Sequence, residues 1–292
     1  MNTIEKAIEK LGVAKAVGVD DRAKTGVVED DVVYEAPDVN LAKASYDAGE
    51  VAEISTILRD KQMLNPSVPQ VKLVEEYRKI KRPVLLNIAN SKEGDYSNLV
   101  MVTSSLPGEG KTFSSINLAV SVAMELDKTV LLVDSDVHKP ATSQLLGVVD
   151  RFGLTDVLVS SDLDLSQVLI KTDIPKVSIL SVGCSRDNSN ELLASQSMID
   201  LMKELSNRYR DRVIIIDTPP LLATNEAGLI ANIVGQILVV VEAENTSPSI
   251  LEESLSLLDH ERSQIGLVLN KARISGKDHQ YYGHYGYTAK GT

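Results

Sequence analysis

The chain has 292 residues, enough for one large domain with an extension, and 43% of them are hydrophobic, enough for a real core. Its net charge of −11 argues against general nucleic-acid binding, which needs a basic surface. The single cysteine, Cys184, excludes an intramolecular disulfide and is interpreted as a small buried hydrophobe. No segment has the pattern of a signal peptide or a membrane span, so we expect a cytoplasmic protein that reaches a membrane only through a partner.

The first 65 residues are predicted to form an extension. Apolar residues recur at helical spacing within residues 1–13, which predicts a short amphipathic helix. These apolar residues are Ile4, Ala7, Ile8 and Leu11. Residues 14–65 are acidic and show no clear apolar period, which predicts a largely disordered linker containing a second short helix at EISTILRDKQML. The following KLVEEYRKIKRP predicts a charged helix that stops at Pro83.

From residue 99 onward, short apolar runs alternate with helical stretches. The runs are LVMVTS, TVLLVD, VSILSV, RVIIIDTPP, QILVVVEA and IGLVLNKA. They are nearly continuous rather than alternating, as expected of parallel strands that are covered on both faces. TFSSINLAVSVAMEL and NELLASQSMIDLMKELSNRY predict crossover helices. The pattern predicts one α/β domain over residues 66–275, doubly wound, with a mostly parallel sheet.

The stretch SLPGEGKT connects the first strand to the first crossover helix. It matches the phosphate-binding loop (P-loop) G-x-x-x-x-G-K-[ST], except that Ser105 replaces the first glycine. The glycines let backbone N–H groups turn toward phosphate oxygens, and the helix start adds a partial positive charge. We expect Lys111 to contact the β- and γ-phosphates of ATP and the Thr112 hydroxyl to hold Mg²⁺. The candidate nucleotide-binding residues are Ser105, Pro107, Gly108, Glu109, Gly110, Lys111, Thr112 and Phe113.

Two later strands end in aspartate. TVLLVD ends in Asp134, with Asp136 close behind, and RVIIID ends in Asp217. Because the carboxyl ends of parallel strands line one ligand-binding edge, these residues should converge on the P-loop. We assign Asp217 to Mg²⁺, directly or through water, and Asp134 to the base that orients a hydroxyl nucleophile, with Asp136 in support or as a simple cap. The predicted catalytic set is Lys111, Asp134, Asp136 and Asp217, and the predicted metal set is Thr112, Asp134 and Asp217.

The last twelve residues contain four of the nine tyrosines, interleaved with glycines that cannot build a core. The candidate phosphorylation sites are Tyr281, Tyr282, Tyr285 and Tyr287. The last strand should end at the same edge as the P-loop, so residues 276–292 are predicted to be a flexible tail on the face of the active site. The eleven residues from Asn270 to Tyr281 reach roughly 36–40 Å when extended, which is enough to enter a neighbouring subunit.

These motifs resemble those of the bacterial tyrosine kinases (BY-kinases), a family built on a MinD/ParA-like P-loop NTPase fold. SSLPGEGKT resembles their Walker A motif, LLVDSDVHKP their second acidic motif and VIIIDTPP their Walker B motif. The tail resembles their tyrosine cluster. EEYRKIK resembles the helix through which family members contact neighbouring subunits, here through Glu75, Arg78 and Lys81. With its N-terminal helix and linker, the chain most resembles the autokinases of exosortase-linked exopolysaccharide loci.

The resemblance implies an ATP- and Mg²⁺-dependent protein-tyrosine autokinase that phosphorylates its own tail, between subunits of a ring-shaped homo-oligomer. It also implies a membrane-embedded polysaccharide co-polymerase that activates the kinase from a separate chain, in exopolysaccharide synthesis or export. Each phosphate adds about −1.5 to −2 charge, so several phosphates should expel the tail from an aspartate-rich pocket and loosen the oligomer.

Three positions depart from the family pattern. His138 replaces an arginine of the second acidic motif, so that a fixed positive charge is lost. Lys81 replaces the last arginine of the interface helix, and lysine cannot make the same two-pronged contact with a carboxylate. Leu106 stands where MinD and ParA relatives carry a signature lysine, which favours a kinase. Asn270 lies where such ATPases often bind the adenine edge, although asparagine at a strand end is also ordinary turn chemistry.

Two other functions stay open from the sequence. A MinD- or ParA-type ATPase switch would hydrolyse ATP without phosphorylating protein, although such proteins often end in an amphipathic helix that this tail lacks. A non-catalytic nucleotide-binding regulator, with the tail as a docking motif, is kept open by His138. Likewise EEYRKIK could be an ordinary solvated helix face, and the N-terminal helix either packs on its own domain or docks on a partner.

Overall fold

The computed structural model describes residues 14–18 and 51–272, except for residues 69, 93, 161–162, 185–188 and 209–210. The helix predicted over residues 1–13 lies outside the described residues, as does the tail over residues 276–292. The four candidate phosphorylation sites are therefore also outside them.

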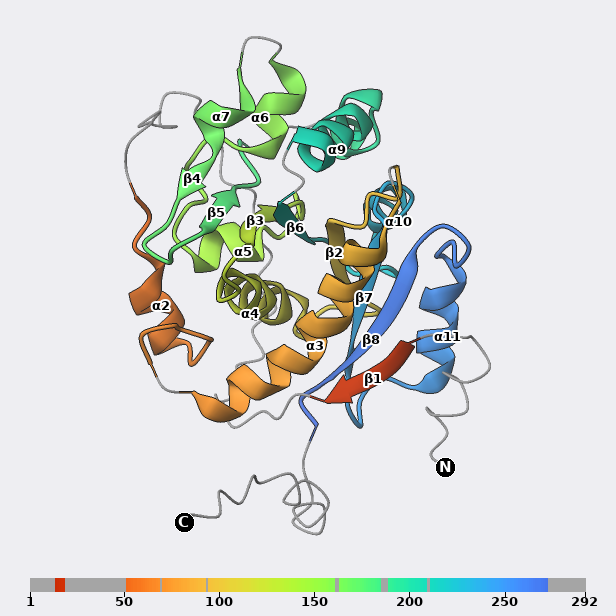
Figure 1. The fold of residues 1–292 in the computed structure, drawn as a ribbon. Coiled ribbons are helices and arrows are strands. Elements are labelled where there is room, and N and C mark those ends of the chain that lie inside the picture. Colours follow the sequence, from red (N-terminus) through yellow and green to blue (C-terminus); the bar gives the residue numbers. More distant parts are fainter. Residues whose placement is uncertain are drawn as a thin grey trace, which may run out of the picture.

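A mixed but mostly parallel sheet forms the centre of the domain, with strand order β1-β8-β7-β2-β6-β3-β5-β4 (Figure 1). All neighbouring strands are parallel except β4, which pairs antiparallel with β5. This arrangement confirms the predicted fold class. The strands are β1 (Ala14–Gly18), β2 (Leu99–Ser104), β3 (Thr129–Asp134), β4 (Ile170–Lys171), β5 (Val177–Leu180), β6 (Arg212–Asp217), β7 (Gln236–Glu242) and β8 (Gln264–Asn270).

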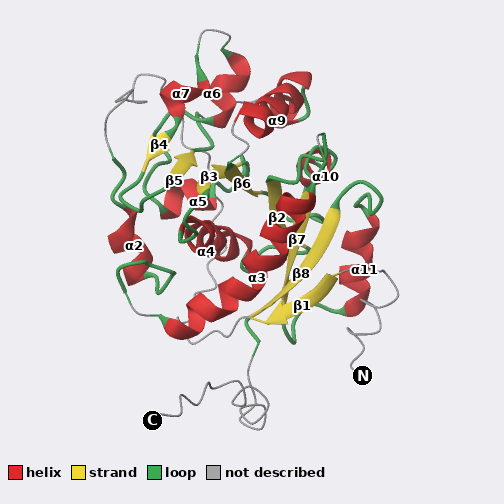
Figure 2. Cartoon of the chain, viewed as in Figure 1, coloured by secondary structure: helices red, strands yellow, loops and turns green. Residues whose placement is uncertain are grey.

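Helices cover both faces of the sheet (Figure 2). Successive residues of a strand point to opposite faces, so Leu99 and Met101 of β2 enter one apolar core, while Val100 and Val102 enter the other. The second core also contains α3 and α4. The helices are α2 (Ile54–Asp60), α3 (Val71–Asn90), α4 (Lys111–Ala123), α5 (Ala141–Leu145), α6 (Leu154–Val159), α7 (Leu165–Val168), α8 (Ser189–Leu193), α9 (Gln196–Arg208), α10 (Glu226–Ala231) and α11 (Pro248–Ser256). Within the described part of the chain, no helix is both long and apolar enough to cross a membrane.

The helix predicted to stop at Pro83 does not stop there, because α3 continues to Asn90. Proline removes one helical hydrogen bond, but Ile80 and Val84 on either side of it are buried against the sheet. Tertiary packing therefore holds both halves of the helix in line. In the same way, the single crossover helix expected over residues 190–209 is divided into α8 and α9.

Residues 51–65 belong to the domain and not to the disordered linker predicted over residues 14–65. Ile54 and Leu58 of α2 are buried in the same core as α3 and α4. The Asp173 carboxylate accepts the Ile54 N–H at 2.8 Å, and Asn117 Oδ1 accepts the Leu64 N–H at 2.6 Å. The prediction fails here because α2 has only seven residues and gains its stability from distant parts of the chain. At the other end of the predicted linker, residues 14–18 form β1, beside β8.

If α2 is part of the domain, Leu58→Ala should lower the free energy of unfolding by about 2–5 kcal/mol, because it opens a cavity in a closed core. The matched control is Leu126→Ala, since Leu126 is 95% exposed and its loss should change stability by less than about 0.5 kcal/mol. Chemical denaturation of both variants makes the comparison. If the two substitutions changed stability equally, residues 51–65 would belong to the linker and not to the domain.

Candidate nucleotide-binding and catalytic site

The P-loop connects β2 to α4 at the carboxyl edge of the sheet. Gly108 and Gly110 have φ values of +87° and +98°, in the left-handed region that other residues rarely adopt. Ser105, in place of the first glycine of the motif, is fully buried, and its hydroxyl lies 2.7 Å from that of Ser254 in α11. The substituted position therefore links the loop to a neighbouring helix.

Asp217, at the end of β6, is the centre of the polar network. Its buried carboxylate accepts hydrogen bonds from the hydroxyls of Thr112 and Thr142, both at 2.7 Å, and from that of Ser115 at 3.2 Å. Burial raises the pKa of Asp217, while the nearby Lys111 ammonium and the threonine hydroxyls oppose that rise. One carboxylate thus joins β6 to the start of α4 and to α5.

Lys111 is almost completely buried, and its ammonium lies 3.0 Å from the Asp136 carboxylate. Burial favours the neutral amine, but Asp217, Asp136 and Asp134 outweigh it, so the pKa of Lys111 is raised. The P-loop lysine is therefore charged, as phosphate binding requires. The second oxygen of Asp136 accepts the Lys139 N–H at 2.9 Å, which fixes the carboxylate facing Lys111.

Asp134 ends β3 directly beside Asp217, since the two residues are paired in the register of β3 and β6. Its carboxylate accepts the N–H groups of Ser143 at 2.7 Å and Asp136 at 3.2 Å. Burial, with the Asp217 charge second, raises the pKa of Asp134 to about 7. A carboxyl group with this pKa suits a general base near neutral pH.

Glu109 and Asn270 hold the outer side of the P-loop. The buried Glu109 carboxylate accepts the Leu106 N–H at 2.6 Å, the Glu242 N–H at 3.3 Å and the Thr246 hydroxyl. Asn270, at the end of β8, donates from Nδ2 to the Glu109 carbonyl at 2.8 Å. The side chain of Asn270 thus contacts the P-loop backbone directly, and adenine recognition by Asn270 stays a prediction.

Gly110 and Lys271 reinforce the contact between Asn270 and the P-loop. A Cβ atom at Gly110 would lie 2.0 Å from Asn270 Nδ2, so only glycine leaves room for the asparagine. Lys271 donates to the Gly108 carbonyl at 3.0 Å and lies 3.1 Å from the Glu242 carboxylate. The end of the last strand is therefore attached to the phosphate-binding loop by two side chains.

The predicted subunit-contact residues do not share one face of α3. Glu75 and Arg78 are exposed and paired with each other. Lys81 is buried, with its ammonium 2.8 Å from the Ser121 carbonyl and 2.6 Å from the Glu125 carboxylate. At 3.6 residues per turn, Lys81 is rotated by about 120° from Glu75, whereas the exposed Arg82 lies on the same side as Glu75. The interface assignment of Lys81 is therefore corrected, because this lysine is used inside the subunit.

His138 lies at the rim of the site with its side chain 53% exposed, and its Nε2 is 3.7 Å from the Glu226 carboxylate. Sequence reasoning missed Ser115, Thr142 and Thr246, whose hydroxyls complete the network. No spacing marks them, since each comes from a different element and meets the aspartates or Glu109 only in the folded chain.

The site fits a nucleotide with Mg²⁺. The left-handed glycines leave the loop backbone uncovered, Lys111 supplies a buried positive charge, and Thr112 and Asp217 present adjacent oxygens. Among the described residues, no cluster of three or more His, Cys, Asp or Glu side chains could hold a metal by itself. An Mg²⁺ ion that arrives on nucleotide phosphates would need only one or two protein carboxylates, such as that of Asp217.

Known proteins share parts of this sequence and of this fold. Residues 98–265, more than half of the chain, match the AAA domain family. CapB of Staphylococcus aureus, named a putative tyrosine-protein kinase, is 30% identical over 75% of this chain and 92% of its own length. EpsB of Ralstonia nicotianae, with the same name, is 31% identical over 82% of this chain but only 32% of its own length. This chain thus spans about a third of that relative. The solved kinase domain of VpsO has a TM-score of 0.55 and 32% identity, over 68% of this chain and all of its own.

A P-loop at the carboxyl edge of a parallel sheet, closed by a lysine and three aspartates, defines a nucleotide-binding domain of the AAA class. Within that class, the identities above are with tyrosine-protein kinases. The chain belongs to the bacterial tyrosine-protein kinase family.

The hydrogen bond from Asn270 to the P-loop predicts that losing this side chain weakens the binding of every nucleotide. Asn270→Ala should weaken the binding of ATP and of GTP by the same factor, about tenfold, because one buried hydrogen bond to the loop is worth about 1–3 kcal/mol. Titration calorimetry with both nucleotides measures this, with Asn245→Ala on the exposed neighbouring loop as the control. Loss of ATP binding with GTP binding unchanged would instead show that Asn270 recognises adenine.

The raised pKa of Asp134 predicts a pH dependence of stability in the nucleotide-free protein. Between pH 4 and pH 7 the unfolded chain releases this proton and the folded chain keeps it, so stability should fall as pH rises to about 7. Asp134→Asn should remove this part of the slope, and the exposed Asp127→Asn should not. Melting temperatures measured between pH 4 and pH 7 test this prediction. If the melting temperatures of wild type and Asp134→Asn fell in parallel, the prediction would be wrong.

Proposed function

We propose that this protein is an ATP-dependent protein-tyrosine autokinase that phosphorylates its own C-terminal tyrosine cluster, between subunits. The observation that carries the proposal is the convergence of Lys111, Asp134 and Asp217 at the edge where β8 ends and is attached to the P-loop. The tyrosine-rich segment begins eleven residues after the end of β8 in the sequence. The identities with named tyrosine-protein kinases support the same activity.

Each polar residue has a role in this reaction. ATP supplies the phosphoryl group, and Mg²⁺ neutralises its charge. Lys111 turns from Asp136 to the β- and γ-phosphates, while Thr112 and Asp217 are placed to hold Mg²⁺. Asp134 orients the tyrosine hydroxyl and accepts its proton as the new P–O bond forms and the bond from the γ-phosphorus to the leaving ADP breaks. Because a phenol has a pKa near 10, this proton moves late, and charge stabilisation by Lys111 contributes most to the rate.

The cellular setting rests on the resemblance of the motifs. We place the kinase at the cytoplasmic face of the membrane, activated by a membrane-embedded polysaccharide co-polymerase on another chain, and controlling exopolysaccharide synthesis or export. The unphosphorylated form assembles into a ring through the exposed face of α3 that carries Glu75 and Arg78. Arg82 takes the third position on this face, because Lys81 is buried.

Purified protein incubated with Mg·ATP, with and without the presumed activator fragment, should gain phosphate on residues 281–287. Lys111→Ala should reduce this at least about a hundredfold, since it removes the charge that stabilises the transferring group. Intact mass and phosphopeptide mapping provide the measurement. Phosphate found on Lys111→Ala after mixing with the active kinase would show transfer between subunits. ATP hydrolysis without phosphotyrosine would instead identify a MinD-type switch.

Phosphorylation should also change the assembly. The fully phosphorylated protein should have a lower mass in solution than Lys111→Ala, because phosphates repel the aspartate-rich site and withdraw the tail. Light scattering coupled to gel filtration measures both masses. The same mass for the two forms would contradict release by the tail.

A further inference from the structure

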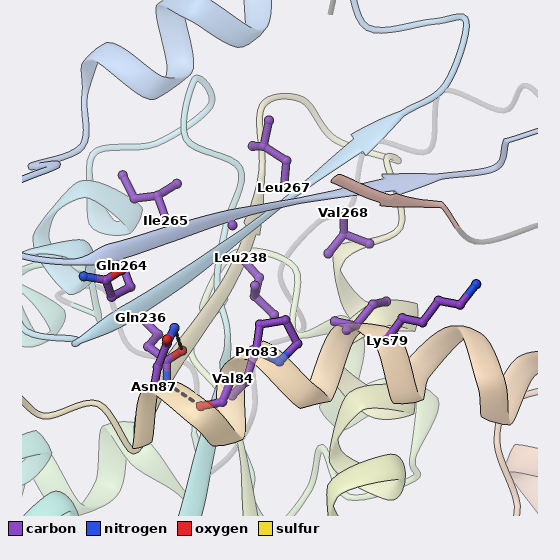
Figure 3. Close-up of a pocket in the computed structure, with 12 residues that line it drawn as sticks. Lys79, Pro83, Val84, Asn87, Gln236, Leu238, Gln264, Ile265, Leu267 and Val268 are labelled. Carbon is purple, nitrogen blue, oxygen red and sulfur yellow. Dashed lines mark hydrogen bonds between the residues drawn. The ribbon is translucent and has the colours of Figure 1, made fainter. Parts of the chain in front are cut away.

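A groove opens between α3 and the strands β7 and β8 (Figure 3). It is a shallow groove with a volume of about 120 Å³. One end is polar, where Gln236 bonds to Asn87 and to the Val84 carbonyl. The remaining lining is mainly apolar, apart from Lys79 and Gln264, and consists of Ile80, Pro83, Val84, Leu238, Ile265, Gly266, Leu267 and Val268.

The groove marks a difference between the two faces of β8. On one face, Ile265 and Leu267 pack with Leu251 and Leu255 of α11. On the other, Val268 and Leu238 point toward α3, on the opposite side of the sheet from Leu267 (Figure 3). Gly266 has no side chain to fill the space between them, and a Cβ there would meet Leu238 at 3.0 Å.

We propose that residues 1–13 of the same chain dock in this groove as a helix antiparallel to β8. The inference is independent of the kinase activity. β1 is parallel to β8 and begins with Ala14 opposite Gly266, so the preceding segment must arrive at the end of the groove where β8 begins. A helix joined to β1 by so short a connection has to fold back along the sheet. With Gly12 and Val13 as the connection, the eleven residues before them span about 16 Å as a helix, which fits within the roughly 23 Å of the seven residues of β8.

The sequence of the segment fits this placement. Its apolar stripe enters the groove, and it consists of Ile4, Ala7, Ile8 and Leu11. Crossovers between parallel strands are almost always right-handed, and this rule, applied to the connection from β2 through α4 to β3, sets which side of β8 faces α3. For a right-handed helix antiparallel to β8, burying the stripe turns Glu5 and Glu9 toward α3. There Lys79 borders the groove and Arg82 is exposed one turn further on. Charge and apolar pattern therefore favour the same orientation.

The connection to β1 also explains how a shallow groove can hold the segment. A tethered helix binds at an effective concentration near millimolar, so a modest apolar contact is sufficient. A partner protein or a second copy of the chain would have no such advantage here.

The chain contains no tryptophan, so a single introduced tryptophan reports on the segment in the full-length protein. Leu11→Trp and, separately, Ile4→Trp place the indole on the apolar stripe, and Lys6→Trp places it on the opposite face. The two stripe reporters should show blue-shifted emission and weak quenching by acrylamide, and the Lys6→Trp reporter should show neither. The shift should be unchanged on dilution, because the docking is intramolecular.

Two changes in the groove test its location. Lys79→Glu repels Glu5 and Glu9, and Pro83→Glu adds a charge to the lining while favouring the helix. Either change should return the stripe reporters to exposed emission, whereas Lys72→Glu, the same charge change elsewhere on α3, should not. An exposed indole in both stripe reporters overturns the proposal. A buried indole whose emission is unchanged by both groove substitutions also overturns it, because the segment then docks at another site. A buried indole that becomes exposed on dilution overturns it as well, because the segment then docks on a second copy of the chain.

Discussion

The site depends on one constraint, a carboxylate held at the buried end of β6. Asp217 accepts three hydroxyl hydrogen bonds, and these come from the first residues of α4 and from α5. An unpaired charge in such a place would cost several kcal/mol, so the surrounding hydroxyls and the nearby Lys111 are required as much as the aspartate is. Because Thr112 directly follows Lys111, the network that satisfies Asp217 also fixes where the P-loop ends and the helix begins.

The charged side chains of the site are paired with each other within the protein. Lys111 faces Asp136, and Asp134 has a pKa near neutrality beside Asp217. Nucleotide phosphates must therefore compete with Asp136 for the lysine before they can use it. The affinity for ATP therefore depends on a difference in free energy between two arrangements, one in which Lys111 pairs with Asp136 and one in which it pairs with the phosphates. This difference makes binding sensitive to the position of the loop that carries Asp136 and His138.

The sequence was most informative where local chemistry and topology agree. Asp134 and Asp217 could be placed together, because aspartates that end parallel strands must meet at one edge. The bounds of β2 and β3 follow from continuous apolar runs. Features that depend on a distant partner could not be predicted. The continuation of α3 past Pro83 depends on burial against the sheet. The burial of the Lys81 side chain depends on its ion pair with Glu125, just after α4. Thr142 reaches Asp217 from another element, and no period in the sequence marks it.

The strand order has a consequence for how the protein is made. Among the described strands, β1 comes first in the sequence and pairs only with β8, which comes last, so β1 has no neighbour in the sheet until every other strand of the domain has been synthesised. Pairing across such a sequence distance is slow, because the loop must close before any contact forms. The same late strand ends in Asn270 and Lys271, which hold the phosphate-binding loop. A chain interrupted before β8 therefore lacks both the edge of the sheet and the side chains that brace the P-loop, so this bracing becomes available only after the last strand of the domain has been made.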